Sequence, residues 1–252
     1  MASTSAPRPR TDRIVTIEAQ PGALDIDMDR TAIIVVDMQN DFGAKGGMFD
    51  RANIDLSSIR SAVEPTAKVL DAARNASIPI VYLKMAFAPD LSDAGPSDAP
   101  NLIKHAPLRV GAVVTAPDGS ESRILIRDTW NTDVIDELTP AADDLIVVKT
   151  RYSGFFNTEL DERLTSLGIK YLIVTGCTTS VCVESTVRDA MFRDYSCVVL
   201  ADCTGEPIAQ DAPRSNHDAS LAVIQAVIGW SSDSATIIAA FDQAADDTAN
   251  VA

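Results

Sequence analysis

The stretch "KYLIVTGCTTSVCVESTVRDAMFRDYSCVVLAD", residues 170–202, decides the fold. It opens with an apolar run, residues 170–176, whose length and β-branched content are typical of a buried strand. A second apolar run, residues 197–202, closes the stretch and predicts another strand. Between them lies a helical pattern whose apolar residues share one face: Val183, Val187, Ala190 and Met191. A strand, a helix and a strand in this order place the two strands parallel to each other.

The same alternation extends over most of the chain. Apolar runs at residues 31–38, 78–85 and 144–150 predict three more strands, and helical patterns follow at residues 59–73, 157–168 and 213–228. The strands are continuously apolar rather than alternating, which indicates a sheet covered on both faces. We therefore predict an α/β fold of three layers, with a mostly parallel, doubly wound sheet between two layers of helices.

A long irregular segment interrupts the alternation after the strand at residues 78–85. It runs to about residue 130 and is rich in proline. The sequence "APDGSES" predicts a turn between two short extended pieces, residues 111–115 and 123–126. Connections of this length inside a domain usually carry function.

The composition favours one acidic domain. The chain has 252 residues and a formal net charge of −15. We predict a disordered or extended N-terminal tail over residues 1–22 and a single domain over residues 23–245. The negative charge disfavours nucleic acid and anionic membranes as partners. No apolar run is long enough to span a bilayer and no secretory signal is evident, so we expect a cytoplasmic protein.

The chain has four cysteines: Cys177, Cys182, Cys197 and Cys203. Their spacings match no zinc motif, and the two histidines lie far away in sequence. A disulfide framework is not expected in the cytoplasm. These cysteines are therefore predicted to be free thiols, most of them buried.

Three strands are predicted to bring reactive side chains to one edge of the sheet. Asp37 ends the first strand, Lys149 ends the third, and Cys182 lies at the start of the helix after the fourth. Ligands of such folds bind beyond the carboxyl ends of the strands. A helix start favours the thiolate of a cysteine, and Asp37 could take its proton while Lys149 keeps Asp37 ionised. Taken singly, each residue also fits a structural role, namely a helix cap, a solvated lysine and a buried thiol.

Three blocks, "AIIVVDMQNDF", "VVKTRYSGFFNTEL" and residues 174–205, resemble the isochorismatase-like cysteine hydrolases in the same order. The resemblance extends over about residues 30–235. It implies a six-stranded sheet and a catalytic triad of Asp37, Lys149 and Cys182. It also implies a cis peptide bond between Cys177 and Thr178, with the backbone N–H groups of Thr178 and Cys182 as the oxyanion hole. Cys177 would then be a structural residue beside the turn.

Within the family, the last two blocks are most similar to the ureidoacrylate amidohydrolases. The resemblance implies cleavage of the C–N bond of a small linear amide, ureido or carbamate substrate through a thioester. Tyr152 would line the pocket, together with Met85 and Phe87, which replace an asparagine and a tryptophan of those enzymes. Because this replacement makes the pocket more apolar, a more apolar amide or carbamate, such as an aryl or alkyl amide, is an alternative substrate. Biuret-like ureas are another alternative.

Other residues are weaker candidates for the same pocket, because a packing role suits each equally well: Asn40, Phe42, Cys177, Arg151, Trp130 and His105. No histidine occurs in residues 84–95, where metal-binding relatives carry two, so we predict no metal and no other cofactor. The resemblance also implies a homo-oligomer, a dimer or tetramer. A non-catalytic binding protein on the same fold remains an alternative. A nucleotide-dependent oxidoreductase is disfavoured because no G-x-G-x-x-G turn follows the first strand.

Overall fold

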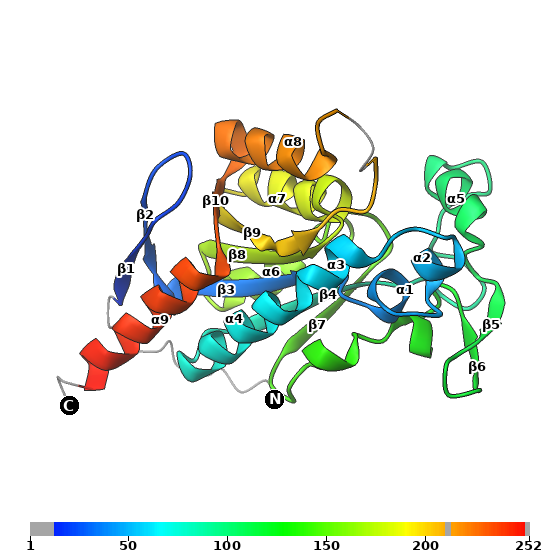
Figure 1. Cartoon of the computed structure of the whole chain (residues 1–252), viewed down its shortest axis with the longest axis horizontal. Helices are drawn as coiled ribbons and strands as arrows, with labels where there is room; N and C mark the ends of the chain where they lie inside the picture. Colours follow the sequence, from blue (N-terminus) through cyan, green and yellow to red (C-terminus); the bar gives the residue numbers. More distant parts are fainter. Residues whose placement is uncertain (1–12, 210–212, 250–252) are drawn as a thin grey trace.

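A six-stranded sheet forms the centre of the molecule (Figure 1). The computed structural model describes residues 13–209 and 213–249. The strand order is β10-β9-β8-β3-β4-β7, and every neighbouring pair is parallel. The strands are β3 (Thr31–Val36), β4 (Ile80–Met85), β7 (Leu145–Lys149), β8 (Tyr171–Cys177), β9 (Ser196–Gly205) and β10 (Trp230–Ser232). The predicted three-layer α/β fold is therefore confirmed. Its sixth strand, β10, has three residues, too few for an apolar pattern to reveal.

Helices cover both faces of the sheet. One layer contains α3 (Ser57–Ser61), α4 (Val63–Asn75) and α9 (Ser234–Ala249). The other contains α6 (Leu160–Ser166), α7 (Glu184–Met191) and α8 (Asn216–Val223), the last continued by a π-helical turn, η6 (Ile224–Ile228). Strand β3 shows why both layers are needed. Ile33 and Val35 pack into one apolar core and Ile34 and Val36 into the other, so no face of this strand meets water.

The predicted helices lie where the sequence placed them, but their first and last residues differ from the predicted ones. The pattern at residues 59–73 becomes two helices, because α3 ends at Ser61 and α4 restarts just before Pro65. The pattern at residues 213–228 begins as a helix at Asn216. There the Ser215 side chain accepts a hydrogen bond from the Asp218 N–H and caps the first turn. Helix α9 was not predicted.

An antiparallel hairpin precedes the sheet. It consists of β1 (Ile14–Ile17) and β2 (Leu24–Asp27), followed by a short 3-10 turn, η1 (Met28–Arg30). The predicted tail over residues 1–22 is thus extended at Ile14–Ile17, where it pairs with β2. Residues 1–12 lie outside the described residues.

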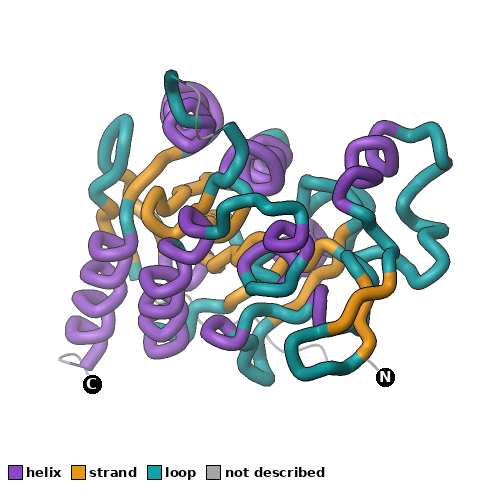
Figure 2. Tube along the Cα trace, turned by 45° about the vertical axis from the view of Figure 1, so that its right-hand side comes forward, coloured by secondary structure: helices purple, strands orange, loops and turns teal. Residues whose placement is uncertain are grey.

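The long segment between β4 and β7 gathers at the end of the sheet where these strands point (Figure 2). Its elements are α5 (Pro100–His105), η2 (Ala106–Leu108), β5 (Val113–Thr115), β6 (Glu121–Arg123), η3 (Trp130–Thr132) and η4 (Asp136–Leu138). At the same end lie α1 (Asn40–Gly43) and α2 (Met48–Arg51), which follow β3.

The predicted pair of extended pieces exists as the antiparallel β5–β6 hairpin. Its second strand, however, is Glu121–Arg123 rather than residues 123–126. The strand stops because Leu125 takes a positive φ of 51° and turns the chain inward. The N–H of Leu125 then donates to the buried carboxylate of Asp41, 2.7 Å away, so residues 124–126 become core.

Candidate active site

Three elements bring the predicted triad together at one edge of the sheet. Asp37 follows β3 directly, Lys149 is the last residue of β7, and Cys182 lies in a π-helical turn, η5 (Thr179–Val183), between β8 and α7. Strand β4 lies between β3 and β7, so the long lysine side chain crosses the end of β4 to meet the aspartate.

The Asp37 carboxylate and the Lys149 ammonium form a buried ion pair. Lys149 Nζ donates to Asp37 Oδ2 at 2.7 Å, and the two side chains are 0% and 1% exposed. Lys149 Nζ also donates to the Arg151 carbonyl oxygen at 3.2 Å. The other carboxylate oxygen, Asp37 Oδ1, is buried and accepts no hydrogen bond from the described residues. One oxygen of the aspartate is therefore held, and the other is available to receive a proton.

Burial raises the pKa of Asp37, although the charge of Lys149 and the neighbouring Cys182 thiol oppose the rise. For Lys149, burial acts in the opposite direction, but the negative charge of Asp37 and the hydrogen bond to it prevail, and the pKa of Lys149 is raised. Asp37 is therefore a stronger base than an exposed aspartate, and Lys149 keeps its positive charge.

The Cys182 thiol is buried beside this ion pair; the residue is 6% exposed. Burial raises its pKa first, the negative charge of Asp37 raises it further, and Lys149 opposes both. The start of the helix was expected to favour the thiolate. Burial and the adjacent carboxylate act in the opposite direction and favour the protonated thiol in the resting site.

A glycine allows the fourth strand to reach the aspartate. Gly176 has a φ of 115°, and a Cβ on it would lie 2.0 Å from the Val36 carbonyl oxygen. This close approach places Cys177 beside Asp37, the residue that follows β3. The Cys177 thiol donates to the Asp37 carbonyl oxygen at 3.3 Å. Cys177 is fully buried, which fits its expected structural role.

The Cys177–Thr178 peptide bond is cis, as the family resemblance implied. The turn that follows is closed by the N–H groups of Val181 and Val183, which donate to the Thr178 carbonyl oxygen at 3.1 and 3.2 Å. Thr178 and Cys182 thus lie on a single short turn at the mouth of α7.

Two residues that the sequence analysis did not assign to the site brace this turn. The Glu206 carboxylate, just beyond β9, accepts from the Ser180 N–H at 2.7 Å and from the Ile208 N–H at 2.9 Å. A 3.0 Å hydrogen bond joins Thr179 Oγ1 to His217 Nδ1 on α8. A carboxylate after an apolar strand was the available signal for Glu206, whereas nothing in the sequence marks His217 as a neighbour of Thr179.

An aromatic group lies beside the triad. The ring of His105 is 5.8 Å from that of Tyr152 and 5.9 Å from that of Phe87, centroid to centroid. Burial raises the pKa of Tyr152. Tyr152 packs against the apolar cluster that contains Cys182, and His105 is one ring further away.

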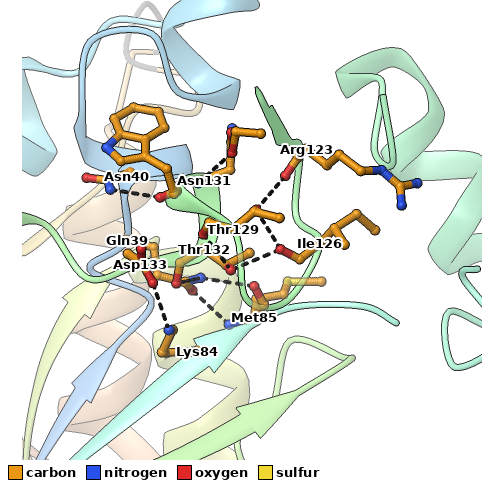
Figure 3. A network of polar contacts seen from close by, with 12 residues as sticks. Gln39, Asn40, Lys84, Met85, Arg123, Ile126, Thr129, Asn131, Thr132 and Asp133 are labelled. Carbon is orange, nitrogen blue, oxygen red and sulfur yellow. Dashed lines mark hydrogen bonds and ion pairs between the residues drawn. The ribbon is translucent and has the colours of Figure 1, made fainter. Parts of the chain in front are cut away.

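Polar contacts fix the loop that follows β4 (Figure 3). The fully buried Gln39 amide donates to the carbonyl oxygens of Met85 and Thr132 at 3.1 and 3.0 Å, and accepts from the Met85 N–H at 2.7 Å. The Asn40 amide donates to the Trp130 carbonyl oxygen at 2.8 Å. These contacts tie the start of α1 to the end of β4 and to η3, so these three segments are held rigidly together at this edge of the sheet.

Four of the remaining pocket candidates are buried, at 0–7% exposure: Asn40, Phe42, Met85 and Phe87. Arg151 and Trp130 are half-buried. Phe42 packs edge-on against Phe49, with ring centroids 5.1 Å apart, and Phe87 packs against His105. Contact of these four side chains with a substrate remains a prediction. Among residues 13–209 and 213–249, no group of three or more His, Cys, Asp or Glu side chains is arranged to hold a metal ion. All four cysteines are free and buried, as predicted.

Comparison with known protein families decides the family. The isochorismatase domain model matches residues 31–236, a span that includes all three residues of the triad. The chain belongs to the isochorismatase family. This membership and the observed fold confirm the resemblance on which the sequence analysis relied.

Relatives of this isochorismatase-family chain are similar over most of its length. The ureidoacrylate amidohydrolase RutB of Methylorubrum extorquens is 40% identical over 230 residues, covering 91% of this chain and 88% of that protein. That of Serratia proteamaculans is 38% identical over 225 residues, covering 89% and 88%. A crystal structure of a cysteine hydrolase from Pseudomonas syringae pv. phaseolicola superimposes with a TM-score of 0.72 at 32% identity, covering 87% of this chain and 95% of that one.

Proposed function

We propose that this protein is a cysteine-dependent amidohydrolase that cleaves a C–N bond of a small linear ureido, amide or carbamate substrate. The observation that carries the proposal is the buried group of Asp37, Lys149 and Cys182, with Asp37 Oδ1 unpartnered in the described part of the chain. Lys149 and Asp37 are completely buried, an arrangement that costs free energy and that function explains better than stability does.

In the first step, Asp37 Oδ1 takes the proton of Cys182 as the sulfur attacks the substrate carbonyl carbon. The C–S bond forms and the carbonyl oxygen becomes an oxyanion. The backbone N–H groups of Thr178 and Cys182 would stabilise that oxyanion, each such donor contributing about 3 kcal/mol. Lys149 stays charged throughout and stabilises Asp37 before it is protonated.

The tetrahedral intermediate then collapses. The C–N bond breaks, the proton held by Asp37 passes to the departing nitrogen, and an amine or ammonia leaves. The acyl or carbamoyl group remains on Cys182 as a thioester. Asp37 next removes a proton from water, whose oxygen attacks the thioester. The C–S bond breaks, and the sulfur recovers the proton from Asp37, so the site returns to its starting state.

The ureido substrate class is supported by relatives at 38–40% identity that are named ureidoacrylate amidohydrolases. The raised pKa of Cys182 supports a mechanism in which Asp37 acts as a base during attack, rather than one that begins from a standing thiolate. Met85 and Phe87 make this edge of the sheet apolar. For that reason aryl or alkyl amides belong in the test alongside ureidoacrylate, and biuret-like ureas are included as the other alternative.

The test is a screen for ammonia and amine release over ureido acids, carbamates, biuret-like ureas and primary amides. We expect Cys182→Ala to lower turnover by more than about a thousandfold. Mass spectrometry of the wild-type protein, quenched during turnover, should show the acyl adduct on the peptide that contains Cys182.

Circular dichroism of Cys182→Ala should match the wild type, because the change removes one sulfur from a folded site. Turnover within about tenfold of the wild type in this variant would contradict the assignment of the nucleophile. A wild-type protein that binds members of the panel and hydrolyses none would instead support a non-catalytic binding protein on the same fold.

We further propose that the protein acts as a homo-oligomer in the cytoplasm and has no nucleic acid partner. Its net charge of −15 supports the last point, since it repels phosphate backbones. Exposed apolar side chains, such as Phe192 at 65% and Val227 at 66%, support a contact between subunits. No described helix is long and apolar enough to cross a bilayer. Light scattering coupled to size exclusion would give the number of subunits.

A further inference from the structure

His105 is a buried imidazole in the segment between β4 and β7, at the edge of the proposed active site. It is the last residue of α5 and is 5% exposed, whereas Ile103 on the same helix is 53% exposed. Its ring contacts those of Phe87 and Tyr152 at 5.9 and 5.8 Å. His105 therefore faces the interior beside Tyr152 rather than the outer surface of α5.

The hydrogen-bonding state of this imidazole follows from its contact with its own helix. His105 Nδ1 lies 2.6 Å from the Asn101 carbonyl oxygen. A carbonyl oxygen can only accept, so Nδ1 must carry the hydrogen. Burial lowers the pKa of His105; the Asn101 contact opposes this, and the charges of Lys149 and Arg151 reinforce it. The neutral ring with hydrogen on Nδ1 presents a lone pair at Nε2.

That lone pair has no partner within the described part of the chain. No residue in 13–209 or 213–249 donates a hydrogen bond to Nε2. Nε2 is also absent from the set of unpartnered side-chain atoms that are sealed from solvent, so a donor from outside the chain can reach it. An acceptor that is open to solvent can be hydrated in the free protein, and an N–H donor on a bound ligand can take the place of that water.

The Tyr152 hydroxyl is in a similar state. It makes no hydrogen bond to the described residues, and the side chain packs against the apolar cluster that contains Cys182. The Tyr152 hydroxyl, which can donate and accept, and His105 Nε2, which can accept, therefore both lack a hydrogen-bond partner among the described residues. A ureido group, which carries N–H on both nitrogens around one carbonyl carbon, matches such a pair.

We propose that His105 is a specificity-determining residue whose Nε2 accepts a hydrogen bond from an N–H of the bound substrate. The site then selects ureido and amide substrates that keep this donor over analogues in which the nitrogen is alkylated. This inference rests on the proposed amidohydrolase function, because it identifies the substrate class of that same site. Asn101 positions the ring by holding Nδ1.

The test combines variants of His105 with methylated substrates. The probes are ureidoacrylate and its two N-methylated forms, one methylated at the internal nitrogen and one dimethylated at the terminal nitrogen. In the wild type, one of the two methylations should lower kcat/KM by about tenfold through loss of the hydrogen bond. His105→Phe keeps the ring contacts and lacks the acceptor, so it should lose about tenfold on ureidoacrylate and be indifferent to that methylation. His105→Gln, whose amide oxygen can replace Nε2, should recover most of the loss.

Calorimetry on inactive protein separates this inference from the proposed function. Ureidoacrylate should bind Cys182→Ala about tenfold more tightly than Cys182→Ala/His105→Phe, whether or not the wild type turns it over. The role of His105 would be overturned if the two inactive proteins bound ureidoacrylate equally tightly, or if neither bound it measurably. It would also be overturned if methylation lowered kcat/KM equally in the wild type and in His105→Phe. Nε2 would then be hydrated and would not contact the substrate. Failure of the wild type to form a thioester would overturn the proposed function and leave the binding comparison intact.

Discussion

Lys149 Nζ lies 2.7 Å from Asp37 Oδ2, across the end of a strand to which neither residue belongs. Both side chains are shielded from water, at 0% and 1% exposure. The pair comes from residues that are 112 positions apart in the chain. Its stability therefore depends on the order β3-β4-β7 at this side of the sheet, and the proposed chemistry depends on the pair.

Lys149→Met should damage both the fold and the activity. The change leaves Asp37 without its partner in a buried site, and breaking a buried ion pair in this way costs about 3–5 kcal/mol of unfolding free energy at neutral pH. Urea unfolding at pH 7 measures that loss. The matched control is Lys68→Met, which breaks an exposed i,i+4 pair with Glu64 and should change the same quantity by less than about 1 kcal/mol. Equal effects of the two changes would contradict a structural role for the buried pair.

The activity should depend on pH through Asp37. Burial raises its pKa above the ordinary 3.8, and the carboxylate form is the one that accepts the thiol proton. As pH falls through the raised value, Asp37 becomes protonated and kcat/KM should decline. Lys149 opposes the rise in pKa, so in Lys149→Met the decline should begin at a higher pH than in the wild type. Profiles of kcat/KM against pH for both proteins test this, and a shift to lower pH would rule out Asp37 as the base.

Much of this site was open to prediction from sequence, because parallel strands end at one edge of their sheet. Asp37, Lys149 and Cys182 could be placed there from the apolar runs alone. The ionisation state of Cys182 could not, since it depends on how deeply the turn is buried and how near the carboxylate lies, neither of which a pattern records. Glu206 follows an apolar strand and could have been placed at this edge in the same way, whereas the contact of His217 with Thr179 depends on how α8 packs against the turn, which no pattern records.

The predicted limits of strands were wrong where a single tertiary contact decides where the strand ends. Residues 124–126 are apolar, two of them are β-branched, and they resemble a strand, yet the Leu125 N–H donates to a buried carboxylate and the chain turns there. Strand β10 has three residues and was expected only because the family has six strands. In both places tertiary contacts prevail over the local pattern.

Gly176→Ala should be among the most damaging single changes near the site. A methyl group there would lie 2.0 Å from the Val36 carbonyl oxygen, and the φ of 115° is unsuitable for alanine. The ends of β8 and β3 would have to separate, carrying Cys182 away from Asp37. We expect a loss of more than about 3 kcal/mol in unfolding free energy, together with loss of activity.

Gly22→Ala is the matched control for this change, because nothing lies within 4 Å of its added methyl group and its φ is not positive. It should leave the free energy of unfolding within about 0.5 kcal/mol of the wild type. Thermal unfolding of both variants beside the wild type gives the comparison. A Gly176→Ala protein as stable and active as Gly22→Ala would show that the close approach of β8 to β3 is not required.

A second buried carboxylate should make stability depend on pH. Asp41 accepts from the N–H groups of Met48 and Leu125 and from the Asn131 amide, and so holds the segment after β6 against α1. Burial nevertheless raises its pKa from 3.8 to about 6, since these hydrogen bonds offset only part of the lost hydration. Between these two values the folded protein binds more protons than the unfolded chain does.

The free energy of unfolding that Asp41 contributes is therefore full below its unfolded pKa of 3.8 and is lost as pH rises through about 6. The loss amounts to about 3 kcal/mol, at 1.36 kcal/mol for each pKa unit. The side chain at this position in Asp41→Asn cannot titrate, so the variant lacks this contribution to the pH dependence of the unfolding free energy. Its free energy of unfolding is also lower overall. Urea unfolding from about pH 4 to about pH 7 should show the wild type losing about 3 kcal/mol more than the variant. Parallel curves for the two proteins would mean that Asp41 titrates near its ordinary value in the folded state.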